Sequence, residues 1–187
     1  MPDSIKDGQS GNIARVGSSL KLDVSSRVND RIYYASRDSE SAFIVQGART
    51  QAAGGTAEGL LYLHYTGTDR INIKQIALST EEPGDGLTAF GIWKKPTVSG
   101  GAVVTPIIMN FGSNNTLDIT TMDGSSDLTV TDGHSLYTVR MKGPGTKIIE
   151  FYDAVILGTG DILAIKTNPT TTGTKTRANI MFAESVE

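Results

Sequence analysis

Apolar and polar residues alternate along most of this chain with the two-residue period of β-strands. Leu61, Leu63 and Tyr65 fall on one face of the segment 60–65, and the segment 136–141 alternates in the same way. Successive side chains of a strand point to opposite faces of a sheet. The pattern therefore predicts strands with one apolar face.

The alternation changes phase once, within the segment 71–78. Apolar side chains at Ile71 and Ile73 are followed by apolar side chains at Ile76 and Leu78. An extra residue in one strand of an antiparallel pair would restore the facing. The sequence thus predicts a β-bulge near Gln75.

Glycine, proline and aspartate mark turns between the remaining predicted strands. Pro106 interrupts one of these strands, which indicates an edge strand or a bend. No window carries a long apolar stripe of helical period. Further strands are predicted at 32–34, 42–45, 87–93, 103–109, 117–119, 148–151, 161–166 and 179–183.

The spacing of the strands predicts the fold class. Many short strands separated by turns are typical of an all-β sandwich or barrel. About eight strands of uneven spacing favour a jelly roll over an immunoglobulin-like sandwich. We therefore expect a jelly-roll-like antiparallel β-sandwich.

The first residues differ from the rest, and we divide the chain into an extended N-terminal arm, 1–28, and a sandwich domain, 29–187. Within the arm, Leu20, Leu22 and Val24 alternate with polar residues among many glycines and serines. Such a segment buries too little apolar surface to fold alone. Fully extended, it spans at most about 90–100 Å, so it could reach a neighbouring molecule.

Composition narrows the function classes. The 187 residues include 21 glycines and no cysteine, which excludes disulfides, thiolate metal sites and cysteine nucleophiles. No apolar run reaches the length that spans a bilayer, and the N-terminus has no apolar signal region. The net charge of −3 argues against a duplex nucleic-acid binder. We expect neither a membrane nor a nucleic acid as partner.

The charge is unevenly placed along the chain. Residues 1–37 carry six basic and four acidic side chains, whereas the remainder carries eleven basic and sixteen acidic ones. Such an asymmetry can arise by chance, or it can let a basic arm lie on an acidic neighbouring surface.

Candidate catalytic residues are few. His64 and His134 are the two histidines, and Ser135 or Asp132 could complete a triad with the second. No Gly-x-Ser-x-Gly elbow supports such a triad, and two histidines far apart in sequence are a poor basis for a zinc site. We therefore expect no enzyme, no metal and no cofactor.

Three other groups have a chemical and a structural interpretation. The carboxylates of the turn 81–86 could act as acid and base, but acidic turn residues commonly serve solvation. The loop 123–127 could hold calcium, although its spacing is not that of an EF-hand. Trp93 and Phe90 could form a carbohydrate-stacking platform, although a lone tryptophan in an apolar strand more often lies in a core.

Three stretches carry a family resemblance: the segment 60–78, the segment 90–97 with the sequence Phe-Gly-Ile-Trp-Lys-Lys-Pro-Thr, and the segment 7–16. The first two resemble the domains of tailed-bacteriophage virion proteins, specifically jelly-roll head decoration (cement) proteins and head fibre proteins, and the third resembles their N-terminal arms. The resemblance implies a homotrimer that binds the outer surface of the head and stabilises it, in a virion assembled in the host cytoplasm. It implies no cofactor.

The expected partners are other copies of the chain and the major capsid protein or other virion proteins. The alternative is a carbohydrate-binding β-sandwich, such as a phage receptor-binding or lectin-like module, which requires exposed aromatic side chains. The arm residues expected to contact a partner are Ile13, Arg15, Val16, Leu20, Lys21, Leu22, Val24 and Arg27.

Overall fold

The structure is a computed structural model, and the chain divides into two units, Met1–Tyr33 and Tyr34–Glu187. In the first unit, β1 (Ser4–Lys6) pairs antiparallel with β2 (Ile13–Arg15). The predicted strands at 20–24 and 32–34 lie outside the described residues. The structure describes residues 4–6, 13–15, 42–110, 113 and 115–185, with side chains for 42–110, 113, 115–151 and 154–184.

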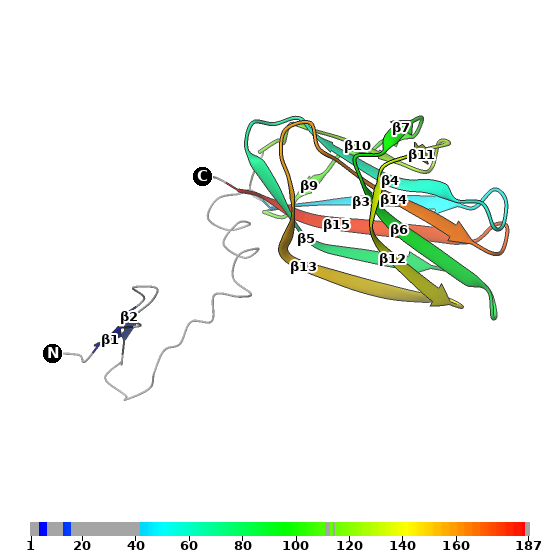
Figure 1. Cartoon of the computed structure of the whole chain (residues 1–187), viewed down its shortest axis with the longest axis horizontal. Helices are drawn as coiled ribbons and strands as arrows, with labels where there is room; N and C mark the ends of the chain where they lie inside the picture. The colour runs from blue at the N-terminus through cyan, green and yellow to red at the C-terminus, as the bar shows by residue number, and fades with distance from the viewer. Residues whose placement is uncertain (1–3, 7–12, 16–41, 111–112, 114, 186–187) are drawn as a thin grey trace. The chain divides into compact units, whose positions relative to one another are not determined.

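The second unit consists of antiparallel sheets (Figure 1). The five-stranded sheet has the order β13 (Gly145–Leu157), β5 (Arg70–Thr80), β15 (Lys175–Ser185), β3 (Ala42–Thr50) and β9 (Ile107–Ile108). The six-stranded sheet has the order β12 (His134–Lys142), β6 (Leu87–Lys94), β14 (Ile162–Pro169), β4 (Glu58–Tyr65), β10 (Ile119–Asp123) and β8 (Ala102–Val103). A further pair joins β7 (Thr97–Ser99) to β11 (Thr129–Thr131).

The connections give the jelly-roll topology. Strands β3, β4, β5 and β6 alternate between the two sheets, and so do β12, β13, β14 and β15. Each sheet thereby receives four of the eight long strands, in the orders β13-β5-β15-β3 and β12-β6-β14-β4, as two Greek keys require. The predicted all-β jelly roll is confirmed, and the described part of the chain contains no helix.

The core lies between the two sheets. Leu61, Leu63 and Tyr65 of β4 point into it and are fully buried. On the neighbouring strands β3 and β15 of the other sheet, the rings of Phe43 and Phe182 stack with their centroids 5.9 Å apart. The predicted apolar face is therefore the face that packs. None of the described residues forms a helix long and apolar enough to cross a membrane.

The predicted bulge in β5 is confirmed. The pairing with β15 shifts register where Gln75 and Ile73 lie opposite Met181 and Phe182, which leaves Lys74 as the extra residue. The shift returns Ile73 to the interior.

Two expectations need correction in detail. The strand predicted at 117–119 runs from Ile119 to Asp123, because its partner is β4 and pairing continues to Leu61. The strand predicted at 103–109 is split into β8 and β9 on either side of Pro106, and the two parts belong to different sheets. Proline has no N–H to donate to a ladder, which accounts for the interruption.

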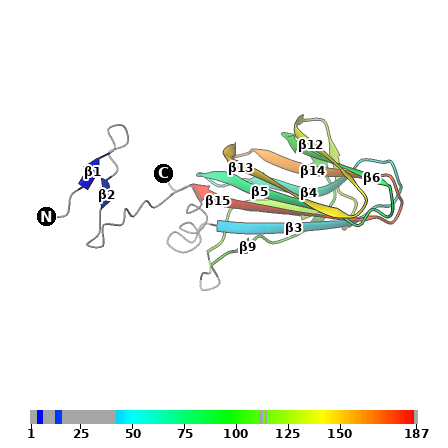
Figure 2. The same ribbon diagram turned by 90° about the horizontal axis from the view of Figure 1, so that it is seen from below.

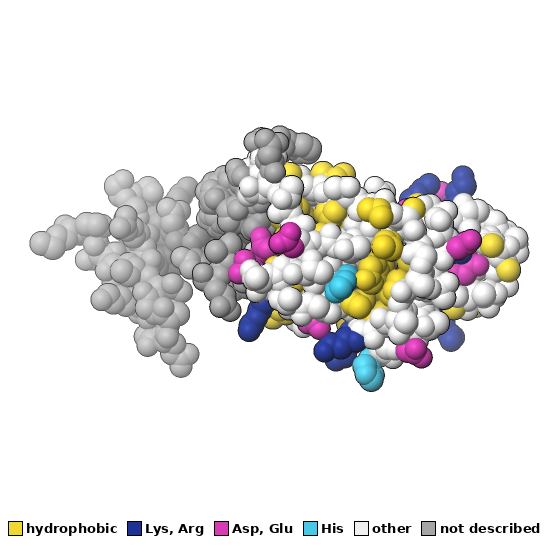
Figure 3. Space-filling view, turned by 90° about the horizontal axis from the view of Figure 1, so that it is seen from above, with side chains coloured by type: hydrophobic (Ala, Val, Ile, Leu, Met, Phe, Trp, Pro, Cys, Tyr) yellow, Lys and Arg dark blue, Asp and Glu magenta, His cyan; other side chains and the backbone are white. Residues whose placement is uncertain are grey.

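A second, smaller apolar cluster lies outside the main core. It contains Tyr62, Leu128, Val130 and Ala164, with Met122 packed against them. Tyr62 alternates with the inward residues of β4, so the cluster covers the outer face of the six-stranded sheet. Figure 3 shows hydrophobic side chains gathered beside a histidine on this side of the domain.

We expect the core to be sensitive to a single truncation. Leu63→Ala should lower the free energy of unfolding by about 2–5 kcal/mol, because it leaves a cavity between the sheets. Chemical denaturation followed by tryptophan fluorescence measures the change. Leu87→Ala is the matched control, since Leu87 is 46% exposed; equal losses in the two variants would contradict the assignment of the core.

Candidate interaction surfaces

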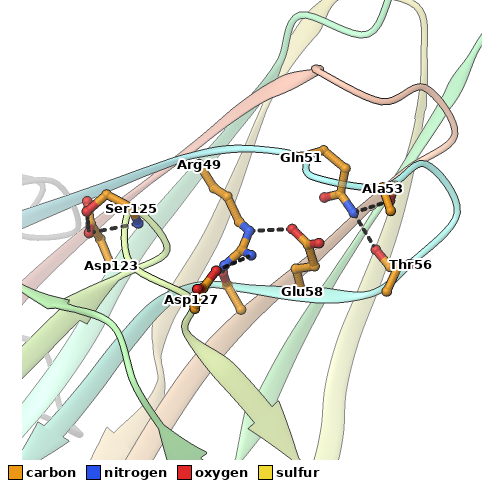
Figure 4. Close-up of polar contacts among 9 residues, drawn as sticks. Arg49, Gln51, Ala53, Thr56, Glu58, Asp123, Ser125 and Asp127 are labelled. Carbon is orange, nitrogen blue, oxygen red and sulfur yellow. Dashed lines mark hydrogen bonds and ion pairs between the residues drawn. The ribbon is translucent and has the colours of Figure 1, made fainter.

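Arg49 is a buried cation at the end of β3 (Figure 4). Its Nε donates a hydrogen bond to the Glu58 carboxylate, and its Nη1 donates to the carbonyl oxygen of Gly59 at 3.2 Å. Its Nη2 lies 3.9 Å from the Asp127 carboxylate. Each of the three guanidinium nitrogens thus has a partner within the same chain. It joins β3 to β4 and to the turn that precedes β11.

The Gly/Ala-rich loop that follows β3 is held from within. Gln51 is buried, and its Nε2 donates to the carbonyl oxygens of Ala53 and Thr56, both at 2.7 Å. These bonds close the loop on itself, as Figure 4 shows.

The candidate calcium loop is a closed turn. Oδ1 of Asp123 accepts hydrogen bonds from the backbone N and the Oγ of Ser125, at 3.1 and 2.5 Å. Asp127 has a positive φ of 41° and pairs with Arg49. Among the described residues, no group of three or more His, Asp or Glu side chains is arranged to hold a metal ion.

A hollow of about 360 Å³ opens beside Arg49. Asp127, Lys175 and Arg177 line it together with small residues. The guanidinium of Arg177 is 3.0 Å from the Glu81 carboxylate, so it is also paired. The hollow mixes both signs of charge and offers little preference for an anion or a cation.

Glu82 is a fully buried carboxylate, although its turn was expected to be solvated. Three hydroxyls donate to it: Thr170 at 2.9 Å, Thr88 at 3.1 Å and Thr174 at 3.2 Å. Burial alone would raise the pKa of Glu82, but hydrogen bonds from these threonines and from Thr171 outweigh it and lower the pKa. Glu82 therefore stays ionised and ties the β5–β6 turn to the β14–β15 turn.

The other carboxylates of this turn lie at the surface. Glu81 pairs with Arg177, and Asp85 lies 3.0 Å from the ammonium of Lys142. The three carboxylates thus have separate partners, and the structure does not bring them together as an acid and base pair.

Tyr65 carries a hydroxyl at the edge of the main core. It donates to Oε1 of Glu184 at 3.1 Å. Burial, the hydrogen bond to Glu184 and the negative charges of Glu184 and Asp69 raise the pKa of Tyr65 to about 12. Burial also raises the pKa of Glu184, and the charges of Asp69 and Asp118 add to this, against the hydrogen bond from Tyr65.

The two histidines do not converge. His64 belongs to β4 and His134 to β12, which are separated in the six-stranded sheet by β14 and β6. The ring of His64 lies beside Tyr62, with centroids 6.3 Å apart. The two histidines therefore do not share a site that could bind a metal ion or serve as a catalytic pair.

The aromatic residues considered for carbohydrate stacking do not form an open platform. Phe90 is buried, and so are two other aromatic residues, Tyr62 and Tyr65 of β4. Trp93 lies on the outer face of β6 and is half-buried, with the ammonium of Lys166 4.9 Å from its ring centroid. Trp93 thus lies outside the main core, contrary to the core interpretation. The Lys166 ammonium lies over its ring in a cation–π contact.

Exposed large apolar side chains gather at the two open edges of the sandwich. The β12–β13 edge, formed by the edge strands of the two sheets, exposes Leu136, Tyr137, Ile148 and Ile156. The β8–β9 edge, residues 102–108 at the opposite end of both sheets, exposes Val103 and Ile107. Figure 2 shows β12 and β13 on one side of the domain and β3 and β9 on the other.

Sequence reasoning missed both edges as candidate surfaces. The alternation of the segment 136–141 runs through Tyr137, Val139 and Met141, and Leu136 is an additional apolar residue directly before it. One of the adjacent residues Leu136 and Tyr137 must point outward, and that was the available signal.

Binding of a partner by the arm residues stays a prediction. Ile13 and Arg15 lie in β2 and pair with Lys6 and Ser4. The remaining predicted residues lie outside the described part of the chain, namely Val16, Leu20, Lys21, Leu22, Val24 and Arg27.

Comparison with known proteins identifies neither a family nor a function for this chain. No protein-family model and no curated protein matches the chain. Among solved structures, the chain aligns with the VP2 subviral particle of infectious bursal disease virus at 12% identity and a TM-score of 0.20. The alignment covers 78% of this chain and 41% of VP2, less than half of that chain. A likeness this weak establishes neither a shared fold nor a shared role.

The Glu82 arrangement predicts a pH dependence. Because its pKa is lower in the folded than in the unfolded protein, ionised Glu82 stabilises the fold above its ordinary pKa of 4.5, and this stabilisation is lost as the pH falls through the folded value. Glu82→Gln should lower the free energy of unfolding at pH 7 by about 1–3 kcal/mol and flatten its decline in acid. Denaturation at a series of pH values measures both.

Glu81→Gln serves as the matched control, since the Glu81 side chain is half exposed. It should change stability by less than about 1 kcal/mol. If Glu82→Gln kept the wild-type acid profile, the buried carboxylate would not be the titrating group.

Proposed function

We propose that this chain is a virion structural protein, a decoration (cement) protein that binds the outer surface of a bacteriophage head as a homotrimer and stabilises it. One observation carries the proposal: large apolar side chains are exposed at both open edges of the sandwich. Scattered apolar side chains are ordinary on a surface, but gathered ones favour contact with another protein. The resemblance to jelly-roll decoration and head fibre proteins supplies the class of assembly.

The internal pairing of the polar groups supports a binding role over a chemical one. The buried charges of Arg49 and Glu82 are each surrounded by groups of their own chain. Catalytic groups need access to a substrate and a pKa matched to their task. We therefore propose that the protein has no catalytic activity and requires no cofactor.

The carbohydrate-binding alternative lacks a specific observation in its favour. It requires exposed aromatic side chains in a hollow, whereas Tyr62 and Tyr65 are buried and Lys166 lies over Trp93.

The arm, 1–28, is proposed to attach each subunit to its neighbours or to the shell. Leu20, Leu22 and Val24 can add a strand to a sheet edge, where main-chain hydrogen bonds give affinity and alternate side chains fix the register. Residues 1–37, which include the arm, carry six basic and four acidic side chains, and this excess favours an acidic partner surface.

The oligomeric state tests the proposed assembly. The purified protein should have three times the mass of one chain, 19.8 kDa, when measured by light scattering at micromolar concentration. The expected reason is that association covers the exposed apolar edges. A stable monomer under these conditions would contradict the trimer.

Deletion of the arm tests attachment separately from folding. A variant lacking residues 2–28 should unfold within a few degrees of the full-length protein, because the core lies between strands that begin at Ala42. It should lose most of its binding to capsid shells in a sedimentation assay. A variant that no longer folds would place the arm in the core, and full binding would place attachment in the domain.

A further inference from the structure

Strand β3 has an unpaired edge over much of its length. On one side it pairs with β15 from Ala42 to Thr50, whereas on the other side β9 pairs with Phe43 and Ile44 alone. No other strand in the described part of the chain pairs with β3, so the stretch 46–50 forms an outer edge of the five-stranded sheet. Such an edge presents backbone donors and acceptors to another chain.

The hydrogen bonds at the two ends of β3 show which backbone groups face this edge. The carbonyl oxygen of Ala42 accepts from the backbone N–H of Met109, directly after β9, at 2.8 Å. Beyond the other end, the N–H of Gln51 donates to the carbonyl oxygen of Thr174, on the β15 side, at 2.9 Å. Backbone groups of successive strand residues bond to opposite neighbours. Three residues therefore point their N–H and C=O groups to the edge, as Ala42 does: Gln46, Ala48 and Thr50.

The stretch 46–50 lacks the features that keep sheet edges from pairing. Short edge strands, proline and inward-pointing charges prevent such pairing. β9 is two residues long and follows Pro106, and the edge strand β13 places the exposed Lys147 opposite the core residue Leu78. The stretch 46–50 contains no proline, and its one charged side chain, Arg49, is buried and bonded to Glu58. It is therefore open to an added strand.

There is room for the side chains of such a strand. The hollow of about 360 Å³ beside Arg49 adjoins this edge, since Ala48 and Thr50 line it from β3 and Gly124 and Ser125 line it from the turn after β10. The outward side chains of the edge, Gln46, Ala48 and Thr50, are exposed and uncharged. An added strand would meet no charge on its immediate neighbours.

The N-terminal arm contains a segment of matching length. The segment 20–24 alternates apolar and polar side chains over five residues, as many as the stretch 46–50 contains. It lies outside the described residues, and the seventeen residues 25–41 join it to Ala42. Such a link spans at most about 60 Å, enough to reach another copy. In its own copy β9 lies on the edge between Ala42 and the free stretch, so a direct hairpin is blocked.

We propose that the segment 20–24 of one copy adds as a strand to the stretch 46–50 of β3 in a neighbouring copy. Backbone hydrogen bonds to Gln46, Ala48 and Thr50 supply the affinity, and alternating side chains fix the register. The inference rests on the proposed attachment by the arm and names the edge that receives it. Because arm and edge are different parts of the chain, the contact is heterologous, and three copies complete a ring when its rotation closes.

The first test removes one backbone donor from the edge of the full-length chain. Ala48→Pro abolishes an edge-facing N–H and leaves the bonds to β15 in place, because proline is tolerated where the N–H of an edge strand faces outward. The mass measured by light scattering at micromolar concentration should fall from three chains to one. Ala48→Ser is the matched control, since it keeps the N–H at the same exposed position, and it should keep the trimer mass. Gln46→Pro replaces the first variant if Ala48→Pro fails to fold.

Amide hydrogen exchange identifies the segment that covers the edge. In the full-length wild type, the amides of Ala48 and Thr50 should be protected, because the arm of a neighbour bonds to them. Leu22→Pro in the arm should abolish this protection. The amides of Gly47 and Arg49, which point to β15, are the internal control and should stay protected in both proteins.

The outcomes separate this inference from the proposed function. Rapid exchange of the Ala48 and Thr50 amides in a wild-type trimer, or a trimer that persists in Ala48→Pro, would overturn the strand addition and leave the virion role standing. Protected amides in a monomeric wild type would place the arm on its own domain and overturn the contact between copies. Binding to capsid shells is measured separately by sedimentation, so its loss or retention tests the proposed function alone.

Discussion

The position of the last two strands determines whether either sheet can form. β14 lies between β6 and β4, and β15 lies between β5 and β3. Without the C-terminal hairpin, each sheet would fall into separate pieces and the apolar interior would stay open. The native pairings are therefore mostly remote in sequence, which is typical of slowly folding β proteins. The hydroxyls of Thr170 and Thr174 fasten this hairpin to the buried carboxylate of Glu82.

The same arrangement leaves two open edges with different properties. One edge consists of the long strands β12 and β13, which are joined directly. The other is covered by the long connection between β6 and β12, which contributes β8 to one sheet and β9 to the other. This connection pairs with one sheet before Pro106 and with the other sheet after it, and the side chains of Val103 and Ile107 stay exposed to solvent. The asymmetry of the two edges follows from the topology.

The sequence pattern predicted the features that depend on residues close together in the chain. It did not predict the features that depend on residues far apart in the chain. The apolar face of β4 and the bulge near Gln75 follow from alternation along a single strand. The burial of Glu82 depends on threonines about 90 positions later in the chain, and no feature of its own turn indicates them. The edge position of Tyr137 likewise follows from strand order, which alternation does not encode.

The buried charges and the exposed apolar groups have opposite consequences for binding. A ligand that competed for Arg49 or Glu82 would leave a buried charge without its partner, which costs about 3–5 kcal/mol. Such competition is unfavourable unless the ligand replaces every contact. Covering Ile107 or Ile148 removes apolar surface from water and contributes about 25 cal/mol for each Å². That contribution disturbs no existing pair. Association through the edges is therefore compatible with the fold as it stands, whereas chemistry at the buried polar groups would have to dismantle part of it.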